Sequence, residues 1–418
     1  MTSLFVVSEH SRLYRAADFP GAECTPTDAY LPDAAFTALK QFIAGADADF
    51  ALSFGWQRGR EVIRTRNYVG LLETRDGTQL EILPKGGGQT PEVLIRMLRC
   101  LPDAPFRHLA TARLGTGHLP LWEVFIAAFL DEVAAVVGQG LQQAYTPRDE
   151  NARFLRGKLR VAGQIQRNAH HPERLAVRFA DRTPDVPPNR LMKTALLAVQ
   201  PRIRTAVNQG RARQLLAALD DVTMSDNIRA DWQNARSAGR LFSRYEAVLQ
   251  WAEILLRGHS LLPQSGKYLN LALLYPMETV FEHYVAAGFR RCLTAGELSV
   301  QESSRHLVDE HGGERRFRLR PDLIWRQGDR TVILDTKWKT LDASNPATNY
   351  GLDPADLYQL YAYGKKYHAT ELLLLYPAND TFRQPLEPFG YEENLHLRVV
   401  PVDLRKSIEA TVLQLGLL

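Results

Sequence analysis

The chain has 418 residues, of which 45% are hydrophobic and 23% are charged, and its formal net charge is +4. A single hydrophobic core rarely grows beyond about 250–300 residues, so this length argues against one compact domain and predicts two or three. The three cysteines, Cys24, Cys100 and Cys292, are far apart and form no CxxC pair, which excludes a disulfide framework and a cysteine-based zinc site.

The N-terminal residues MTSLFVVSEHSRLYR contain neither a basic leader nor a long apolar run, so no secretory signal is expected. The longest apolar stretch, 119–137, is interrupted by Glu123, Asp131 and Glu132. It therefore predicts an amphipathic helix rather than a membrane span. We expect a cytoplasmic protein without a membrane segment.

Residues 1–117 are predicted to form a strand-rich N-terminal domain. The alternating segments VIRTRNYVGLLET and TQLEILPKG flank Arg75-Asp76-Gly77, and Asp-Gly between such segments is typical of a β-hairpin. A short helix is predicted around Glu92–Leu101.

Residues 118–260 are predicted to form an α-rich, basic middle region. Helical patterns cover 119–138, 189–207, 211–220 and 238–257, and FLRGKLRVAG from Phe154 predicts a strand. Between residues 148 and 215 there are 15 Lys and Arg against 5 Asp and Glu, a local net charge of +10, so the rest of the chain carries −6 (4 − 10). This region either grips DNA phosphates or is a solvated helical surface.

Residues 261–418 are predicted to form a small mixed sheet flanked by helices. The pattern predicts helices at 276–293, 354–367 and 405–415, and strands at 298–302, 315–325, 330–336, 371–376 and 395–402. The predicted fold is therefore an α+β, multidomain one.

The residues that carry chemistry lie in this last segment. Asp322 follows Pro321 at the start of one predicted strand, and Asp335 and Lys337 lie on the next, after the turn Gln327-Gly328-Asp329. Strand side chains alternate between faces, so Asp335 and Lys337 project to the same side. Asp322, 13 residues before Asp335 and across the predicted hairpin, is able to approach them.

These residue types suit the hydrolysis of a phosphodiester. The substrate is anionic and repels hydroxide, so cleavage needs a cation that neutralises charge and activates water. Mg²⁺ takes oxygen ligands and keeps several waters, so two carboxylates and the Thr336 carbonyl suffice for a half-open site. A lysine beside the metal orients the attacking water or stabilises the transition-state oxyanion.

An isolated Asp-x-Lys is usually only part of a solvated strand face. Three features favour a catalytic site here. The motif follows the apolar run VILD, typical of a buried strand, and a Pro-Asp dipeptide precedes it at hairpin spacing. Downstream, Gln359 and Tyr363 lie four residues apart on one face of the predicted helix 354–367.

The order acid, Asp-x-Lys, Gln-x-x-x-Tyr resembles the RecB-like branch of the PD-(D/E)xK nucleases. Several phrases are more specifically similar to the McrC family, the nuclease subunits of modification-dependent restriction systems. They are NYVGLLETRDGTQLEILPKGG (67–87), FLRGKLRV (154–161), DVPPNRLMKTAL (185–196), LYPMETVFEHYV (274–285), the block 320–337 and QLYAYG (359–364). The resemblance covers roughly residues 60–400.

The resemblance implies a role for each matching residue. Asp322 and Asp335 become metal ligands for Mg²⁺, which Mn²⁺ could replace, and Lys337 becomes the catalytic lysine. Gln359 and Tyr363 become a supporting pair that contacts substrate phosphate or orders the site. Glu282, on the helix before the sheet, is a further candidate that reaches the metal through water, with Glu278 as its rival.

The resemblance also implies partners. McrC-like proteins act with a McrB-like AAA+ GTPase hexamer, engaged by the N-terminal domain and the middle region, and cut modified double-stranded DNA. Two alternatives remain open. The chain could be a dormant adaptor that only stimulates the ring, or a stand-alone RecB-like nuclease.

Overall fold

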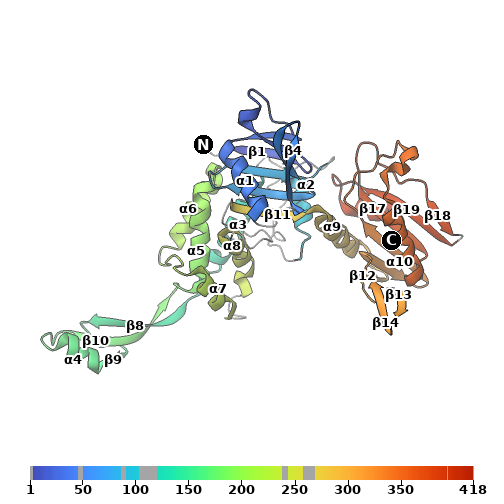
Figure 1. Cartoon of the computed structure of the whole chain (residues 1–418). Helices are drawn as coiled ribbons and strands as arrows, with labels where there is room; N and C mark the ends of the chain where they lie inside the picture. The colour runs from blue at the N-terminus through green and yellow to red at the C-terminus, as the bar shows by residue number, and fades with distance from the viewer. Residues whose placement is uncertain are drawn as a thin grey trace. The chain divides into compact units, whose positions relative to one another are not determined.

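The chain forms two compact units in the computed structural model, which describes residues 3–45, 50–85, 91–102, 120–237, 243–257, 269–392 and 394–417 (Figure 1). One unit combines Met1–Leu121 with Gly258–Leu418, and the other is Trp122–Arg257. The first unit is therefore built from both ends of the chain. The predicted domain boundaries at 117/118 and 260/261 lie outside the described residues.

The N-terminal part of the first unit contains two four-stranded sheets. Their strand orders are β1-β7-β6-β11 and β3-β2-β5-β4. One core joins them, because helix α1 buries Phe36, Leu39 and Phe42 against strands of both sheets. The bounds of these elements are β1 Leu4–Ser8, β2 Arg12–Arg15, β3 Asp28–Leu31, α1 Asp33–Gly45, β4 Leu52–Gln57, β5 Arg60–Thr65, β6 Tyr68–Thr74, β7 Gln79–Leu83, α2 Pro91–Leu98 and β11 Leu269–Pro276.

The Asp-Gly hairpin and the short helix are both present as predicted. β6 and β7 pair antiparallel, and the Asp76 carboxylate accepts hydrogen bonds from the hydroxyls of Thr74 and Thr78, which closes the turn. The edge strand β11, which the sequence analysis did not predict, pairs antiparallel with β6. At their closest approach only glycine fits, because a Cβ on Gly70 would lie 1.9 Å from the Leu273 carbonyl oxygen.

The second unit is a group of helices that carries a β-structured arm (Figure 1). Its three-stranded sheet has the order β8-β10-β9. The elements are α3 Leu121–Gly138, β8 Ala144–Ala152, β9 Lys158–Leu159, α4 Val161–Asn168, β10 Leu175–Thr183, α5 Pro187–Val199, α6 Ala206–Ala218, α7 Ile228–Ser237 and α8 Glu246–Arg257. The predicted helices at 119–138 and 189–207 correspond to α3 and α5, although the second ends near Pro201.

The predicted strand from Phe154 is wrong for most of its length. Only Lys158–Leu159 pairs as a strand, and helix α4 begins at Val161. Gly157 explains the interruption, because its φ of +68° is a conformation in which most residues would be strained. The long strands β8 and β10 were missed because their sequences, AYTPRDENA and LAVRFADRT, are rich in charge and lack regular apolar alternation.

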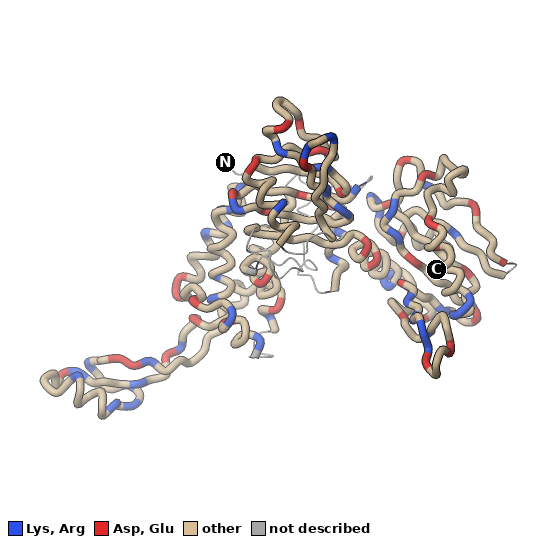
Figure 2. Tube along the Cα trace, viewed as in Figure 1, with Lys and Arg blue, Asp and Glu red and all other residues tan. Residues whose placement is uncertain are grey.

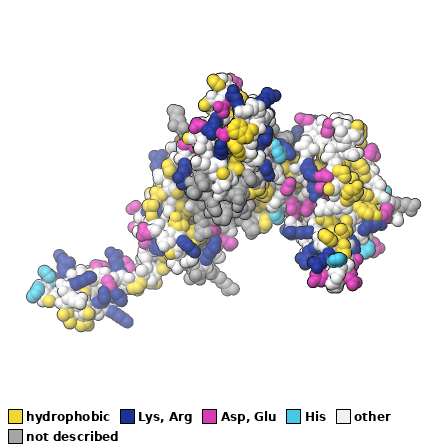
Figure 3. Space-filling model, viewed as in Figure 1, with side chains coloured by type: hydrophobic (Ala, Val, Ile, Leu, Met, Phe, Trp, Pro, Cys, Tyr) yellow, Lys and Arg dark blue, Asp and Glu magenta, His cyan; other side chains and the backbone are white. Residues whose placement is uncertain are grey.

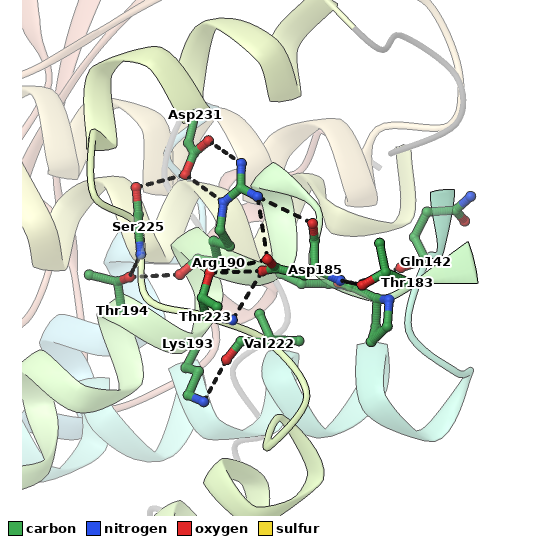
Figure 4. A network of polar contacts seen from close by, with 12 residues as sticks. Gln142, Thr183, Asp185, Arg190, Lys193, Thr194, Val222, Thr223, Ser225 and Asp231 are labelled. Carbon is green, nitrogen blue, oxygen red and sulfur yellow. Dashed lines mark hydrogen bonds and ion pairs between the residues drawn. The ribbon is translucent and has the colours of Figure 1, made fainter. Parts of the chain in front are cut away.

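A polar network anchors helix α5 within the helical unit (Figure 4). Arg190 donates two hydrogen bonds to Asp231, at 3.1 and 2.7 Å, and the Ser225 hydroxyl donates to the same carboxylate at 2.7 Å. Lys193 donates to the carbonyls of Leu219 and Val222. These contacts tie α5 to the loop before α7 and to α7 itself.

The excess basic charge of the arm is partly neutralised by ion pairs. Asp149 pairs with both Arg160 and Arg178, and Arg156 pairs with Glu150. Acidic positions therefore lie among the basic ones along the arm (Figure 2). The arm also exposes apolar side chains, which Figure 3 shows near its end. They are Phe154, Leu155, Leu159, Val161 and Ile165.

The C-terminal part of the first unit is a six-stranded mixed sheet of order β12-β15-β16-β17-β19-β18. β15 and β16 form an antiparallel hairpin, and β16 and β17 run parallel because helix α10 crosses between them. The elements are α9 Met277–Cys292, β12 Glu297–Val300, β13 His306–His311, β14 Glu314–Arg318, β15 Leu323–Gln327, β16 Arg330–Thr336, α10 Pro354–Tyr367, β17 Glu371–Pro377, β18 Phe389–Glu392, β19 Leu395–Val402 and α11 Ile408–Leu415.

The predicted strand 315–325 is in fact two strands. Residues 314–318 pair with β13 in a separate exposed hairpin, and the chain joins the main sheet only at Leu323. The sequence of β14, ERRFR, is exposed throughout, so it has no buried face with which to join the sheet. The other predicted elements of this part match observed ones, and the predicted α10 has the observed bounds.

Candidate active site

Asp322 and Asp335 lie opposite each other at one end of the β15–β16 hairpin. The strand register pairs Leu323 with Leu334, so Asp322 and Asp335 are the next two residues in that register. Residues directly opposite in an antiparallel pair point to the same face of the sheet. Asp335 is only 2% exposed, and its buried carboxyl group is close enough to Asp322 for the charge of Asp322 to raise its pKa.

Thr336 holds the Asp322 carboxylate in place. Its backbone N–H and its hydroxyl both donate to Asp322 Oδ2, each at 2.7 Å. Burial nevertheless raises the pKa of Asp322 above its ordinary value, and these two hydrogen bonds and the charge of Lys337 oppose that rise only in part.

Lys337 lies beside Asp335. Its Nζ is 2.5 Å from the buried Asp335 Oδ2, in a close ion pair. Burial and the neighbouring charge of Asp322 raise the pKa of Asp335. Burial works to lower the pKa of Lys337, but the charges of Asp335 and Asp356 outweigh it and raise that pKa, so the ammonium group stays charged.

Gln359 and Tyr363 connect Lys337 to the turn before Asp322. Lys337 Nζ donates to Gln359 Oε1 at 3.3 Å, and Gln359 Nε2 donates to the Tyr363 hydroxyl at 2.7 Å. The Tyr363 hydroxyl then donates to the Arg320 carbonyl at 3.2 Å. Gln359 and Tyr363 both lie on α10, whose first turn is well capped. The Asp353 side chain accepts a hydrogen bond from the Ala355 N–H, and Pro354 is the first helical residue.

Glu282, rather than Glu278, lies on the side of α9 that faces the site. Burial and the charge of Asp322 raise the pKa of Glu282, and Gln301 donates a hydrogen bond to its carboxylate. Glu278 instead accepts a hydrogen bond from Asn67. Gln301 also accepts from Arg320 and donates its backbone N–H to the Asp322 carbonyl, so one residue joins α9 to the aspartate turn.

The donor set fits a hard divalent cation. Asp322 and Asp335 are two buried carboxyl groups that disfavour each other's ionisation, and a cation between them would relieve that cost. Asp335 Oδ2 contacts Lys337 Nζ, and a carboxylate oxygen has a second lone pair that a cation could take. In this conformation, no three His, Cys, Asp or Glu side chains of the described residues are grouped so that they could hold a metal ion. Ligation by Asp322, Asp335 and Glu282 together would therefore need side-chain movement or a bridging water.

A family model described as McrBC 5-methylcytosine restriction system component matches residues 63–377, which is most of the chain. The chain belongs to this McrBC family. The resemblance found in its sequence is thereby confirmed. A search of curated proteins gives no match.

Two solved structures resemble this McrBC-family chain. The first is a refined half-complex from the tetradecameric assembly of Thermococcus gammatolerans McrB AAA+ hexamers with bound McrC. The match has a TM-score of 0.70 and 19% identity, and it covers 99% of this chain and 100% of that one. The second is the cryo-EM structure of the T. gammatolerans McrBC complex, at a TM-score of 0.49 and 21% identity, covering 71% of this chain and 89% of that one. The first match confirms the predicted mixed α and β fold.

The sequence analysis of this McrBC-family chain missed Asp356. The Asp356 carboxylate is buried, accepts from Lys339 Nζ at 2.9 Å, and has Oδ1 3.8 Å from Lys337 Nζ. Its helical spacing was a usable signal, because Asp356, Gln359 and Tyr363 lie at i, i+3 and i+7 on one helix face. Gln301 offered no such signal, since its contacts depend on how the turn folds.

The described helices of this McrBC-family chain include none that is both long enough and apolar enough to cross a membrane.

Proposed function

We propose that this chain is the DNA endonuclease subunit of a modification-dependent restriction complex and hydrolyses phosphodiesters with Mg²⁺, for which Mn²⁺ could substitute. The observation that carries the proposal is the opposition of Asp322 and Asp335 across the β15–β16 hairpin, with Lys337 against Asp335. The family to which the chain belongs consists of restriction-system components, which agrees with this chemistry.

Each residue of the site has a distinct task in this proposal. Asp322, Asp335 and the Thr336 carbonyl would hold the metal, with Glu282 reaching it through water. When bound, Mg²⁺ supplies charge neutralisation at the phosphate and a more acidic water. Lys337 places a positive charge beside the reacting phosphate and orients the attacking water, while Gln359 and Tyr363 fix the position of Lys337.

The proposed partner is a McrB-like AAA+ GTPase hexamer whose hydrolysis this chain stimulates. Two observations support it. The T. gammatolerans McrC whose fold this chain shares was solved bound to McrB AAA+ hexamers. The arm exposes the apolar side chains of Phe154, Leu155, Leu159, Val161 and Ile165, and an exposed apolar cluster of this kind marks an interaction surface. We assign partner binding to the N-terminal part and the helical unit.

The proposed substrate is modified double-stranded DNA. The family description names a 5-methylcytosine restriction system. Recognition of the modified base is assigned to the partner, and this chain is assigned the cleavage step.

Cleavage by the reconstituted complex tests the site. Asp335→Ala and Lys337→Ala should each lower the DNA cleavage rate by more than about 100-fold, the loss expected when a metal ligand or a transition-state charge is removed. Nucleotide hydrolysis by the partner should be unchanged. The matched control is Lys365→Ala, an exposed lysine of the same helix as Gln359 that pairs with Glu392, and it should cut normally.

The same experiment separates the alternatives. Normal cutting by both site variants would show that the catalytic residues lie elsewhere. Nucleotide turnover without any DNA nicking under Mg²⁺ or Mn²⁺ would identify a dormant adaptor. Full activity of this chain without a partner would identify a stand-alone nuclease.

A further inference from the structure

A cavity of about 780 Å³ lies between α2, α9 and the segment that leads into α11, apart from the aspartate site. Five of the described residues that line it are arginines, and one is acidic, Glu409. The lining therefore carries a formal charge of +4 (5 − 1). The arginines come from three separate elements and are Arg96, Arg99, Arg290, Arg291 and Arg405.

Ion pairs within the chain compensate only part of this charge. Arg291 pairs with Glu409 at 3.1 Å, and Arg405 pairs with Asp403 at 2.9 Å. Arg96 donates to two backbone carbonyls, and its charge also helps to lower the pKa of Glu409. In the part of the chain that the structure describes, Arg99 and Arg290 form no ion pair. Like charges that converge repel one another, so an external anion bound here would relieve the repulsion.

A buried hydroxyl at this cavity lacks a hydrogen-bond acceptor among the described residues. Tyr284, on α9, is 2% exposed and lines the cavity, and the nearest charged group to its hydroxyl, Arg96, is itself a hydrogen-bond donor. Burial raises the pKa of Tyr284, so the hydroxyl remains a proton donor at neutral pH. A buried donor without a partner is costly, and an anionic oxygen would satisfy it.

The positive surface continues beyond this cavity. A neighbouring hollow of about 350 Å³ is lined by Arg383, Lys406 and one acid, Asp403, and Arg405 lines both. A track of this kind suits a polyanion better than a single small ion. The Tyr284 ring is buried and thus not available for stacking on a base, which favours backbone phosphates over a nucleotide.

We propose that this arginine cavity binds the phosphate backbone of duplex DNA without regard to sequence. The inference rests on the proposed function, in which DNA is the substrate. Arg290 lies eight residues after Glu282 on α9, or about 12 Å along the helix axis, and about a quarter turn around it. That separation corresponds to about three or four base pairs, so one duplex could reach both the aspartate site, near Glu282, and the arginine cavity.

The test measures binding of fluorescent duplex DNA to the full chain by anisotropy, without divalent ions and at several salt concentrations. The double variant Arg99→Gln/Arg290→Gln should bind about 10-fold more weakly at low salt. The slope of log affinity against log salt should become shallower by about 1 to 2, because each phosphate contact contributes about 0.9. The control variant Arg64→Gln/Arg66→Gln removes the same charge from exposed positions in and next to β5 and should match the wild type.

Wild-type affinity and salt slope in the Arg99/Arg290 variant would overturn the inference. Strong competition by GTP or inorganic pyrophosphate would also overturn the inference, if it occurs at concentrations that leave the salt dependence of the control variant unchanged. That result would identify a site for small anions. If the double variant unfolds, the single variant Arg290→Gln, at an exposed position, is tested in its place. Thermal melting shows whether each variant is folded. Because no metal is present, the binding result is independent of whether the aspartate site cuts DNA.

Discussion

At the scale of single residues, the environment of Lys337 gives the sharpest expectation. Its ammonium group lies between Asp335, at 2.5 Å, and Asp356, at 3.8 Å. A cation bound to Asp335 would compete with Lys337 for the same carboxylate. Asp356 offers the lysine a second negative charge, and Lys339 and the Asp356 position at the start of α10 keep that carboxylate in place.

Asp356→Asn should therefore weaken Mn²⁺ binding about 3- to 10-fold and lower the cleavage rate by a similar or larger factor, because Lys337 is then held by Asp335 alone. The control is Asp353→Asn, which removes the other carboxylate bound to Lys339 but keeps a good helix cap. Calorimetric titration with Mn²⁺ measures the effect. In a Lys337→Met background, Asp356→Asn should change Mn²⁺ affinity no further. A full additional loss there would mean that Asp356 acts on the metal directly.

Glu9 provides a prediction about pH. Its buried carboxyl group accepts hydrogen bonds from the Trp338 indole and from the Lys85 N–H. Burial raises the pKa of Glu9 to about 7, and the two hydrogen bonds only partly oppose this. Because the folded-state pKa lies above that of the unfolded chain, this group favours folding fully below about pH 4.5, and the contribution is lost as the pH rises towards 7.

That contribution amounts to about 3 kcal/mol between these pH values. In Glu9→Gln, the free energy of unfolding should fall less between about pH 4.5 and pH 7 than in the wild type. Urea unfolding at several pH values measures this difference. Parallel pH profiles for the variant and the wild type would contradict the assignment.

The site residues that the sequence predicted are those placed by local periodicity. Asp335 and Lys337 follow from strand alternation, and Gln359 and Tyr363 follow from helical spacing. The roles of Thr336 and Gln301 could not be predicted in this way. Thr336 binds Asp322 because two strands meet in one register, and Gln301 takes a positive φ of 51° in a turn that the sequence does not mark.

At the scale of elements, the predictable ones are those with a regular pattern of burial. β16, β17 and β19 are nearly continuous apolar strands, and α10 has both a cap and a regular spacing. The strands β8, β10, β13 and β14 were not predicted correctly, because their sequences are rich in charged residues and show no regular apolar face. β11 was missed because its partner, β6, lies about 200 residues earlier in the chain.

The Arg190–Asp231 pair should be a main support of the helical unit. Asp231→Ala should lower the free energy of unfolding of this unit by about 2–4 kcal/mol, because it removes the closer of the two carboxylates that pair with a guanidinium only 24% exposed. The control, Arg148→Gln, breaks an exposed pair with Asp181 and should cost less than about 1 kcal/mol. Hydrogen exchange in α5 and α7 distinguishes the two. Equal protection in both variants would contradict the proposed support.

At the scale of the whole molecule, the C-terminal part that holds the candidate site forms one compact unit with the N-terminal part. β11 belongs to the N-terminal sheet, and Trp338, next to Lys337, binds Glu9 near the N-terminus. The fragment 261–418 should therefore be less soluble and cut more weakly than the full chain, because β11 would expose its apolar residues. A fragment with full activity and a wild-type melting temperature would show that these contacts are dispensable.

The most direct test of the central claim is the position of a metal ion. Crystals of the full chain soaked in Mn²⁺ should show an anomalous-scattering peak about 2.0–2.3 Å from carboxylate oxygens of both Asp322 and Asp335, with Lys337 moved away from Asp335. The peak should vanish in Asp335→Asn. An ordered site with no peak, or a peak that contacts neither aspartate, would contradict the proposed hydrolytic site.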